Sequence, residues 1–317
     1  MMRRRDFLKA GGAGLVGSTV FSISGLTMLS PGNANAATVS FNLTAEGTYK
    51  TLVDGVSVYV WQFIDTNSTG PGALTSGLVV KEGDAVSVTV NNNLDRNIRF
   101  SIPGVSMSST RTISPGSSRT YSFTAPAAGS YLYTDNVNGE LSRAMGLAGP
   151  MVVMTTNGSN NLYSGGPVFD RQYTLFMSEL DDRLNAAVQA GGSYNMANYE
   201  PNYYFANGLS YPDTKSNSDT LIAMSVGEDV AIRFINGGAI TYPMHFHGYH
   251  VNVASRNRII EKNVIEKDTV QVERGECVDV ILPVAQAGTY PLHTHYVPGV
   301  SANGVYAKGG LVLMSAA

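Results

Sequence analysis

The sequence is poor in cysteine, with Cys277 as the single example in 317 residues. One cysteine cannot form an intramolecular disulfide, so no internal disulfide stabilises this chain. Cys277 lies in residues 275–282, a stretch with the pattern of a strand, which favours a buried apolar role. An intermolecular disulfide or a metal ligand is the alternative.

Charged residues are also scarce, at 14% of the sequence, and the net charge is −3. No run of like charges follows the N-terminal arginines, which argues against a nucleic-acid partner. Long amphipathic helical patterns are missing too. The 34 glycines and 17 tyrosines are typical of many short strands joined by tight turns, and the length allows two domains.

The first 36 residues have the features of a cleaved export signal. Residues 3–9 resemble a twin-arginine motif, a moderately apolar stretch follows, and Ala34 to Ala36 offer a small-residue cleavage site. Residues 10–29 are broken by glycine and serine and would make a poor membrane-spanning helix. Cleavage removes four basic residues and one acidic residue, so the net charge becomes −6. We therefore expect a periplasmic or secreted protein, exported by the twin-arginine pathway and without a membrane anchor after cleavage.

The rest of the chain alternates between strand patterns and turn residues, which predicts an all-β fold. One short stretch, residues 184–190, has a helical pattern, and residues 155–166 are rich in Asn, Ser, Thr and Gly, as in a linker. The strands that we expect in the first half are residues 38–43, 58–63, 85–90, 97–102, 118–124, 130–133 and 150–154.

The two halves of the chain repeat each other, which predicts two tandem β-sandwiches of one kind. We place the first domain at residues 37–160 and the second at residues 161–317. The matching segments are residues 80–86 with 225–230, 99–104 with 243–248, 129–136 with 288–295, and 146–153 with 309–313.

Only five histidines occur, and all of them lie in two short runs, residues 242–250 and 292–295. Alternate residues of a strand share a face, so His245 with His247 and His293 with His295 each present two imidazoles to one side. Two such pairs on neighbouring strands would offer four nitrogen ligands to a transition metal. The alternative is a set of core or surface histidines without a metal.

Several segments in order resemble the multicopper oxidase superfamily, the group that includes laccases and copper nitrite reductases. The resemblance covers essentially the whole chain after residue 36, and it implies two cupredoxin-like Greek-key β-sandwich domains and copper as the cofactor. The segments that carry it are residues 144–149, 205–212, 233–237 and 243–248.

Three departures from the family pattern concern the type 1 copper, which takes electrons from substrate in active relatives. Its cysteine lies between two histidines, and here that position is Thr294. Its first histidine corresponds to Tyr242, and its second corresponds to Gly299. Without a thiolate, the second domain cannot form a blue copper centre.

The first domain lacks histidines altogether, so the resemblance implies a structural or assembly role for it. Ser101 and Pro103 fall on one family histidine pair, Thr134 and Asn136 fall on another, and Asp135 falls on the cysteine position. Among these five residues, only Asp135 has a side chain that could serve as a copper ligand.

In the second domain, the resemblance assigns His245 to the type 2 ligand and His247, His293 and His295 to type 3 ligands. Four imidazoles could hold one copper ion, or two with water or anions as further ligands. A relic site that binds nothing is the alternative. We expect His250, which lies on the other strand face from His247, to be a supporting or surface residue.

Three kinds of function stay open at this point. The chain could be a copper-dependent oxidoreductase that oxidises a small molecule or a metal ion, a non-catalytic copper-handling protein, or a copper-free structural scaffold. Two-domain relatives form rings of three, so the resemblance implies a homotrimer in which the histidines face the first domain of a neighbour.

Overall fold

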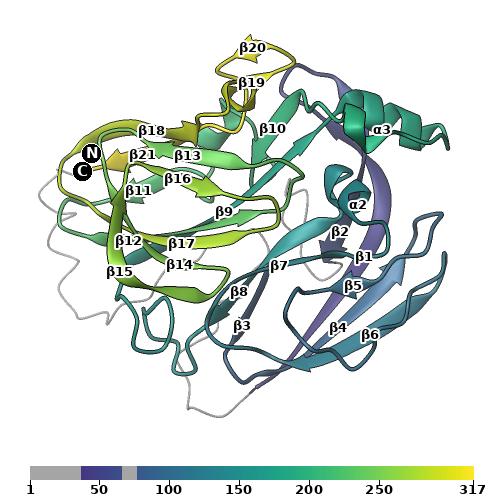
Figure 1. Cartoon of the computed structure of the whole chain (residues 1–317), viewed down its shortest axis with the longest axis horizontal. Coiled ribbons are helices and arrows are strands. Elements are labelled where there is room, and N and C mark those ends of the chain that lie inside the picture. Colours follow the sequence, from purple (N-terminus) through teal and green to yellow (C-terminus); the bar gives the residue numbers. More distant parts are fainter. Residues whose placement is uncertain (1–36, 66–76) are drawn as a thin grey trace, which may run out of the picture.

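The computed structural model describes residues 37–65 and 77–317, which form two β-sandwiches in chain order (Figure 1). The expected export signal, residues 1–36, lies outside the described residues. Within residues 37–65 and 77–317, no helix combines the length and hydropathy needed to cross a membrane.

The N-terminal sandwich consists of two four-stranded sheets with strand orders β2-β1-β4-β6 and β3-β8-β7-β5. A short helix, α2 (Glu140–Ala144), precedes β8. The strands are β1 (Thr38–Thr51), β2 (Ser57–Asp65), β3 (Leu78–Lys81), β4 (Ala85–Asn92), β5 (Phe100–Ser101), β6 (Ser118–Thr124), β7 (Gly129–Asp135) and β8 (Ala148–Met154).

The C-terminal sandwich pairs a six-stranded sheet, β10-β9-β12-β17-β14-β15, with a five-stranded sheet, β11-β21-β18-β13-β16. A small hairpin of β19 (Ser301–Ala302) and β20 (Val305–Tyr306) lies beside β10. The strands of the two sheets are β9 (Arg171–Leu180), β10 (Tyr203–Ala206), β11 (Ile222–Met224), β12 (Asp229–Asn236), β13 (Tyr242–Phe246), β14 (Val251–Arg256), β15 (Ile259–Lys267), β16 (Thr269–Val272), β17 (Cys277–Pro283), β18 (Gly288–Thr294) and β21 (Val312–Ala316).

The repeat read from the sequence is present in the topology. In the first domain β1 pairs in parallel with β4, and β3 pairs in parallel with β8. In the second domain β9 pairs in parallel with β12, and β11 pairs in parallel with β21. The order β3-β8-β7-β5 therefore recurs as β11-β21-β18-β13, and this sheet carries the histidines.

Each sandwich has its own hydrophobic core because apolar residues alternate along its strands. The first core surrounds the buried Trp61, together with Phe63, Phe100 and Tyr133. The second core contains Phe234 and Phe246, whose rings meet edge to face at 5.9 Å. The sequence correctly predicted an all-β fold on these alternating patterns.

The predicted helix is α3 (Asp182–Gln189), which begins two residues earlier than expected. The carboxylate of Asp181 caps it by accepting a hydrogen bond from the backbone N–H of Arg183 at 3.1 Å. Leu184 and Val188 pack on the first core, so this helix from the second half covers β2 of the first domain.

The two domains share a buried boundary in which β7 packs against β12 and β17. Leu132 of β7 joins Phe176, Ile235 and Cys277 in one apolar cluster. Cys277 is therefore buried, as predicted, and burial raises the pKa of its thiol. Most residues of β10, β12 and β17 are also buried. The second sheet of their own domain covers one face of these strands, and β7 of the first domain packs against β12 and β17.

A buried hydrogen-bond network that contains an ion pair lies at the same boundary. The guanidinium of Arg233 in β12 lies 3.4 Å from the carboxylate of Asp279 in β17, and Ser130 of β7 donates its hydroxyl to that carboxylate. Gln172 accepts a further hydrogen bond from Arg233 at 3.0 Å. Removing either charge alone would leave the other buried without compensation. The hydroxyl of Ser130, which belongs to the first domain, links the two domains through this network.

Candidate metal centre

The four histidines singled out by the sequence come from two adjacent central strands, β13 and β18. The pairing is antiparallel and sets His245 directly opposite His293. It extends beyond both strand ends, because the backbone N–H of His247 donates to the carbonyl of Pro291 at 3.1 Å and that of His295 donates to Pro243 at 2.7 Å. All four side chains consequently lie on one face of the sheet.

The imidazole rings gather closely on that face. The centroid of the His245 ring lies 4.2 Å from that of His295, 4.7 Å from that of His247 and 6.1 Å from that of His293. The Nε2 atoms of His247 and His293 are 3.0 Å apart. Two ring nitrogens at this separation suit two ligands of a single ion with metal–nitrogen distances of about 2.0 Å.

Hydrogen bonds fix the orientation of two of the rings. Nδ1 of His293 lies 2.9 Å from the carbonyl oxygen of Thr294, so this nitrogen carries the proton and Nε2 keeps its lone pair. Nδ1 of His245 lies 3.0 Å from the hydroxyl of Thr269, which β16 places directly opposite it. Such partners on the outer nitrogen hold a metal-binding imidazole in place.

The surroundings of His247 and His293 favour the neutral form, which binds metals. Burial lowers the pKa of His247, and the nearby His245 and His295 lower it further. Burial is also the main cause that lowers the pKa of His293, against the hydrogen bond to Thr294. A neutral imidazole does not have to lose a proton before its free nitrogen binds a metal.

The donor chemistry fits copper, while the full geometry is not preformed. Imidazole nitrogen is a good ligand for copper, and His247 and His293 already converge. In the part of the chain that the structure describes, no three His, Cys, Asp or Glu side chains hold their donor atoms around one point. Side-chain rotation of His245 and His295 would have to complete a site with four nitrogens, and metal binding by the four stays a prediction.

Exposure separates the four rings into two classes. His247 and His295 are exposed at the ends of the paired strands, whereas His245 and His293 are half-buried between them. The histidine face therefore opens outward from the domain, where a small molecule or another chain can reach it. His250, the fifth histidine, is also exposed and follows the strand end.

The type 1 copper position implied by the resemblance is closed by packing. Tyr242 and Thr294 lie on the core face of the same strands, opposite the histidine face, and both are buried. A Cβ atom on Gly299 would lie 2.4 Å from Cγ2 of Thr294. Tyr242, Thr294 and Gly299 therefore occupy the three positions of the type 1 copper ligands. They provide a phenol, a threonine side chain and no side chain, respectively, so none of them is a cysteine or a histidine.

The carboxylate of Glu179 in β9 is buried and accepts a hydrogen bond from the hydroxyl of Tyr242. This residue was not identified from the sequence. It also accepts hydrogen bonds from the backbone N–H of Ala239 and, at 3.3 Å, from the hydroxyl of Tyr199. Burial nevertheless raises its pKa. The available signal was an acidic residue inside the otherwise apolar end of β9.

Gly238 makes room for this carboxylate. A Cβ atom there would lie 1.9 Å from Oε2 of Glu179, and no flexible neighbour could relieve the overlap without moving that buried group. The position of Glu179 therefore depends on Gly238, which follows β12.

The first domain contains the same strand register without ligands. Ser101 lies directly opposite Thr134, which is the counterpart of His245 opposite His293. Asp135 is only 1% exposed, and it accepts hydrogen bonds from the backbone of Arg99 at 2.7 Å and from the hydroxyl of Ser142 at 2.6 Å. Its carboxylate stabilises the loop around α2, so it is not available as a metal ligand.

Comparison with known families assigns both domains. The family model described as "Multicopper oxidase" matches residues 59–158, and a second model with the same description matches residues 186–307. The two matches together cover well over half of the chain. Among curated protein sequences, none matches this chain.

Solved structures with the same architecture include copper oxidases and a copper nitrite reductase. The "Multicopper Oxidase mgLAC" superimposes with a TM-score of 0.73 at 24% identity, covering 88% of this chain and 86% of that chain. A blue copper oxidase from Nitrosomonas europaea gives 0.74 at 23% identity, with the same two coverages. Copper nitrite reductase from Nitrosomonas europaea gives 0.67 at 18% identity, covering 89% and 94%.

These likenesses establish the fold as two tandem cupredoxin-like domains, as predicted. The chain belongs to the multicopper oxidase family. Copper is the cofactor that this membership implies. The ligands, the substrate and the assembly of this particular chain do not follow from likenesses at 17–24% identity.

Proposed function

We propose that this chain is an exported copper-binding protein with an oxidase-like four-histidine site on its second domain. The observation that supports the proposal is the direct pairing of His245 with His293, flanked on the same face by His247 and His295. A strand register that brings four of the five histidines of a chain onto one face supplies the type and number of ligands that a metal site uses.

Each residue near the site would have a defined role. His247 and His293 would bind the ion through Nε2, since those atoms already converge. Thr269 and the carbonyl of Thr294 would hold the outer nitrogens of His245 and His293. Bound copper would supply one-electron redox chemistry and a position for a small molecule.

The closed type 1 position favours a protein that binds copper without a blue centre. Thr294 cannot provide a thiolate, and the hydroxyl of the buried Tyr242 is engaged by the buried carboxylate of Glu179. A copper-handling protein without turnover is the second candidate, because it needs the four imidazoles and no electron entry site. A copper-free scaffold is the third.

A ring of three subunits forms part of the proposal, on the basis of the family resemblance. The exposed His247 and His295 would then face the first domain of a neighbour. Thr134 and Asp135 are buried within their own domain, so Ser101, Pro103 and Asn136 are the aligned positions with exposed surface to offer. None of the three is a strong copper ligand, so the four imidazoles would supply the protein nitrogen ligands.

Copper loading of single-histidine variants tests the metal site. The purified chain should take up copper in stoichiometric amounts, and His245→Ala and His293→Ala should each lower the bound copper at a fixed free concentration. His250→Ala is the matched control, because it removes an exposed histidine outside the two pairs. Equal copper uptake by all variants would show that copper binds elsewhere and would refute the four-histidine site. No uptake by the unaltered chain would leave the copper-free scaffold.

Oxygen consumption separates the first two candidates. The loaded protein is mixed with phenols, cuprous ions or ferrous ions, and oxygen uptake is compared with that of the His293→Ala variant. Uptake that depends on His293 supports an oxidase, whereas stoichiometric copper without uptake supports a copper-handling protein. No intense blue absorption should appear in either case, because Cys277 lies in the apolar boundary between domains.

Export is tested on the full chain in a bacterium with a twin-arginine pathway. Replacing Arg3, Arg4 and Arg5 with lysine should retain the protein in the cytoplasm, while the unaltered chain is processed and released. Unchanged release of the lysine variant would refute this route of export.

A further inference from the structure

The six-stranded sheet of the second domain carries a pocket on the face that points away from the second core. Its volume is about 420 Å³, which lies within the usual range for sites that bind small molecules. The histidines belong to the other sheet of the sandwich, so a molecule in this pocket would not contact them. The pocket is therefore a candidate site separate from the metal centre.

A bulge in β15 forms one wall of this pocket. The β14–β15 register shifts there, because Val253 pairs with Ile265 whereas Ser255 pairs with Ile260. Residues 261–264 consequently have only one residue of β14 opposite them, and they bulge out of the ladder to line the pocket. Bulges redirect side chains and are common beside functional sites.

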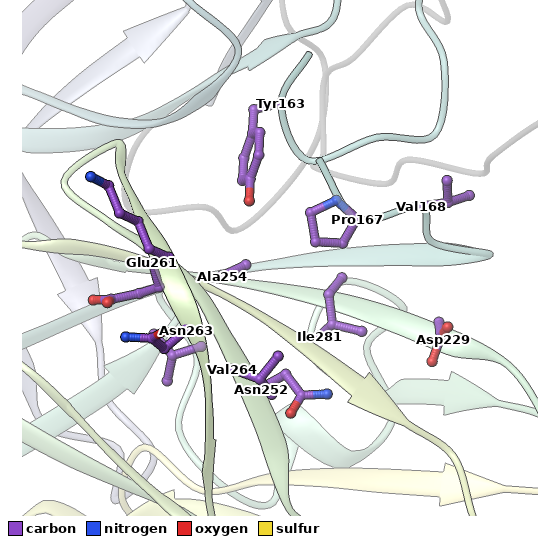
Figure 2. A pocket seen from close by; sticks show the side chains of 12 residues that line it. Tyr163, Pro167, Val168, Asp229, Asn252, Ala254, Glu261, Asn263, Val264 and Ile281 are labelled. Carbon is purple, nitrogen blue, oxygen red and sulfur yellow. The ribbon is translucent and has the colours of Figure 1, made fainter. Parts of the chain in front are cut away.

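The floor and the opposite wall of the pocket are apolar. Ala254 and Ile281 form the floor and belong to a buried cluster on this face of the sheet. Pro167 and Val168, from the segment between the domains, lie across from Val264 (Figure 2). Val168 is 64% exposed and Val264 is 82% exposed, so branched side chains on both walls face water beside an open space. A ligand that covered them would remove this apolar surface from water.

Tyr163 adds an aromatic ring that is fixed in position. Figure 2 shows the ring over the floor, with its hydroxyl directed toward Ala254. A Cβ atom on Gly166 would lie 2.4 Å from Cε2 of this ring, so the glycine lets the loop close against it. The backbone N–H of Gly166 donates to the carbonyl of Tyr163 at 2.9 Å, and the amide of Asn161 donates to the carbonyl of Gly166 at 2.9 Å. The face of such a ring attracts a cation.

The polar side chains of the pocket favour a ligand that donates hydrogen bonds. Within residues 37–65 and 77–317, the carboxylates of Asp229 and Glu261 and the amide of Asn252 form no hydrogen bond or ion pair. Two carboxylates against the single ammonium of Lys262 leave the lining acidic. A carboxylate accepts hydrogen bonds and cannot donate them, so a protonated amine is a suitable partner.

We propose that this pocket is a second binding site, for a small organic cation in which a protonated amine is joined to a flat apolar body. The amine would lie at Asp229, and the apolar body would cover the floor between Tyr163 and Val264. The site does not need copper and does not depend on the histidines.

Calorimetric titration of the metal-free chain tests the preference for a cation. Phenethylamine is the probe, and phenethyl alcohol is its uncharged match. The amine should bind roughly threefold to fivefold tighter than the alcohol, as expected for one exposed ion pair, and Asp229→Asn should abolish this preference. Asp268→Asn is the matched control, because it removes the same charge from an exposed residue outside the pocket. No binding, equal affinities for the two probes, or an unchanged preference in Asp229→Asn would overturn the proposal.

Methyl NMR tests the position of the bound probe. In a chain labelled at its valine and isoleucine methyl groups, phenethylamine should shift the signals of Val168, Val264 and Ile281 most. The signals of Val305, which is exposed on the β19–β20 hairpin, should not move. Asn263→Trp should place an indole in the pocket and remove the shifts, with circular dichroism as the check that the variant folds.

Two outcomes of the NMR experiment would refute this site. One is that the largest shifts fall on residues outside the pocket, and the other is that a folded Asn263→Trp variant binds phenethylamine as the unaltered chain does. Neither outcome bears on copper uptake by the histidine variants, so the two proposals can fail separately.

Discussion

Gly299 and Thr294 are tightly packed at the position where an active relative would hold its type 1 copper, and substitution there tests how firmly it is closed. An alanine at position 299 would place its Cβ 2.4 Å from Cγ2 of Thr294. Thr294 is buried, so neither group can move into solvent. Overpacking of this kind costs about 1–3 kcal/mol, which the lower unfolded-state entropy of alanine offsets by about 0.4–1 kcal/mol.

The companion substitution Thr294→Ser removes the methyl group that the new Cβ would meet. It keeps the hydroxyl, which accepts the backbone N–H of Tyr296 at 3.1 Å. Alone it should cost about 1 kcal/mol, since one buried methyl group is lost. Together with Gly299→Ala it should cost less than the two single changes added, because the alanine methyl occupies the space that threonine leaves.

We expect a coupling free energy of about 1–2 kcal/mol from this double-mutant cycle. The measurement is urea unfolding followed by far-UV circular dichroism on the unaltered chain, both single variants and the double variant. Additive effects within about 0.3 kcal/mol would refute the reasoning, since they would mean that Gly299 and Thr294 do not share a packed contact.

Three further predictions follow from the contacts described above. Thr269→Val removes the hydroxyl beside Nδ1 of His245 and should weaken copper binding by roughly tenfold in a competition titration with a chelator; an unchanged affinity would argue against a role in orienting the ring. Because burial raises the pKa of Glu179 above its unfolded value, this residue should contribute most to stability at acidic pH and lose that contribution as the pH rises through the folded pKa. The stability of Glu179→Gln should accordingly fall less between pH 5 and pH 8 than that of the unaltered chain, and parallel curves would contradict this. Arg233→Met leaves Asp279 buried without its partner and should cost about 3–5 kcal/mol, whereas Arg233→Met/Asp279→Leu should recover most of that loss.

Much of the fold could be predicted because apolar alternation and the internal repeat both carry physical information. The expected strands at residues 85–90 and 118–124 appear as β4 and β6, and the expected pairing of repeats appears as equal strand orders in both domains. The expected strand at residues 97–102 was too long, since β5 is only Phe100–Ser101. Asp135 accepts the backbone N–H of Arg99 there, and this contact replaces strand pairing.

The candidate site was only partly visible in the sequence. Alternation predicted that His245 shares a face with His247, but the register that sets His245 opposite His293 depends on tertiary pairing. Thr269 and Glu179 reach the site region from other strands, so no spacing along the chain could have pointed to them. The same limitation applies to β15, whose isoleucines look like core residues until the sheet order shows that it is an edge.

The buried boundary between the two sandwiches has a consequence for how the protein can be divided. Cutting the chain after β8 would strip Leu132 and Ser130 from the second half and expose Cys277, Phe176 and the carboxylate of Asp279 to water. The first domain, which lacks histidines, thus shields an apolar face of the histidine-bearing second domain from water. A shortened protein made to isolate the histidine-bearing half should aggregate, while the intact pair should unfold in one cooperative step.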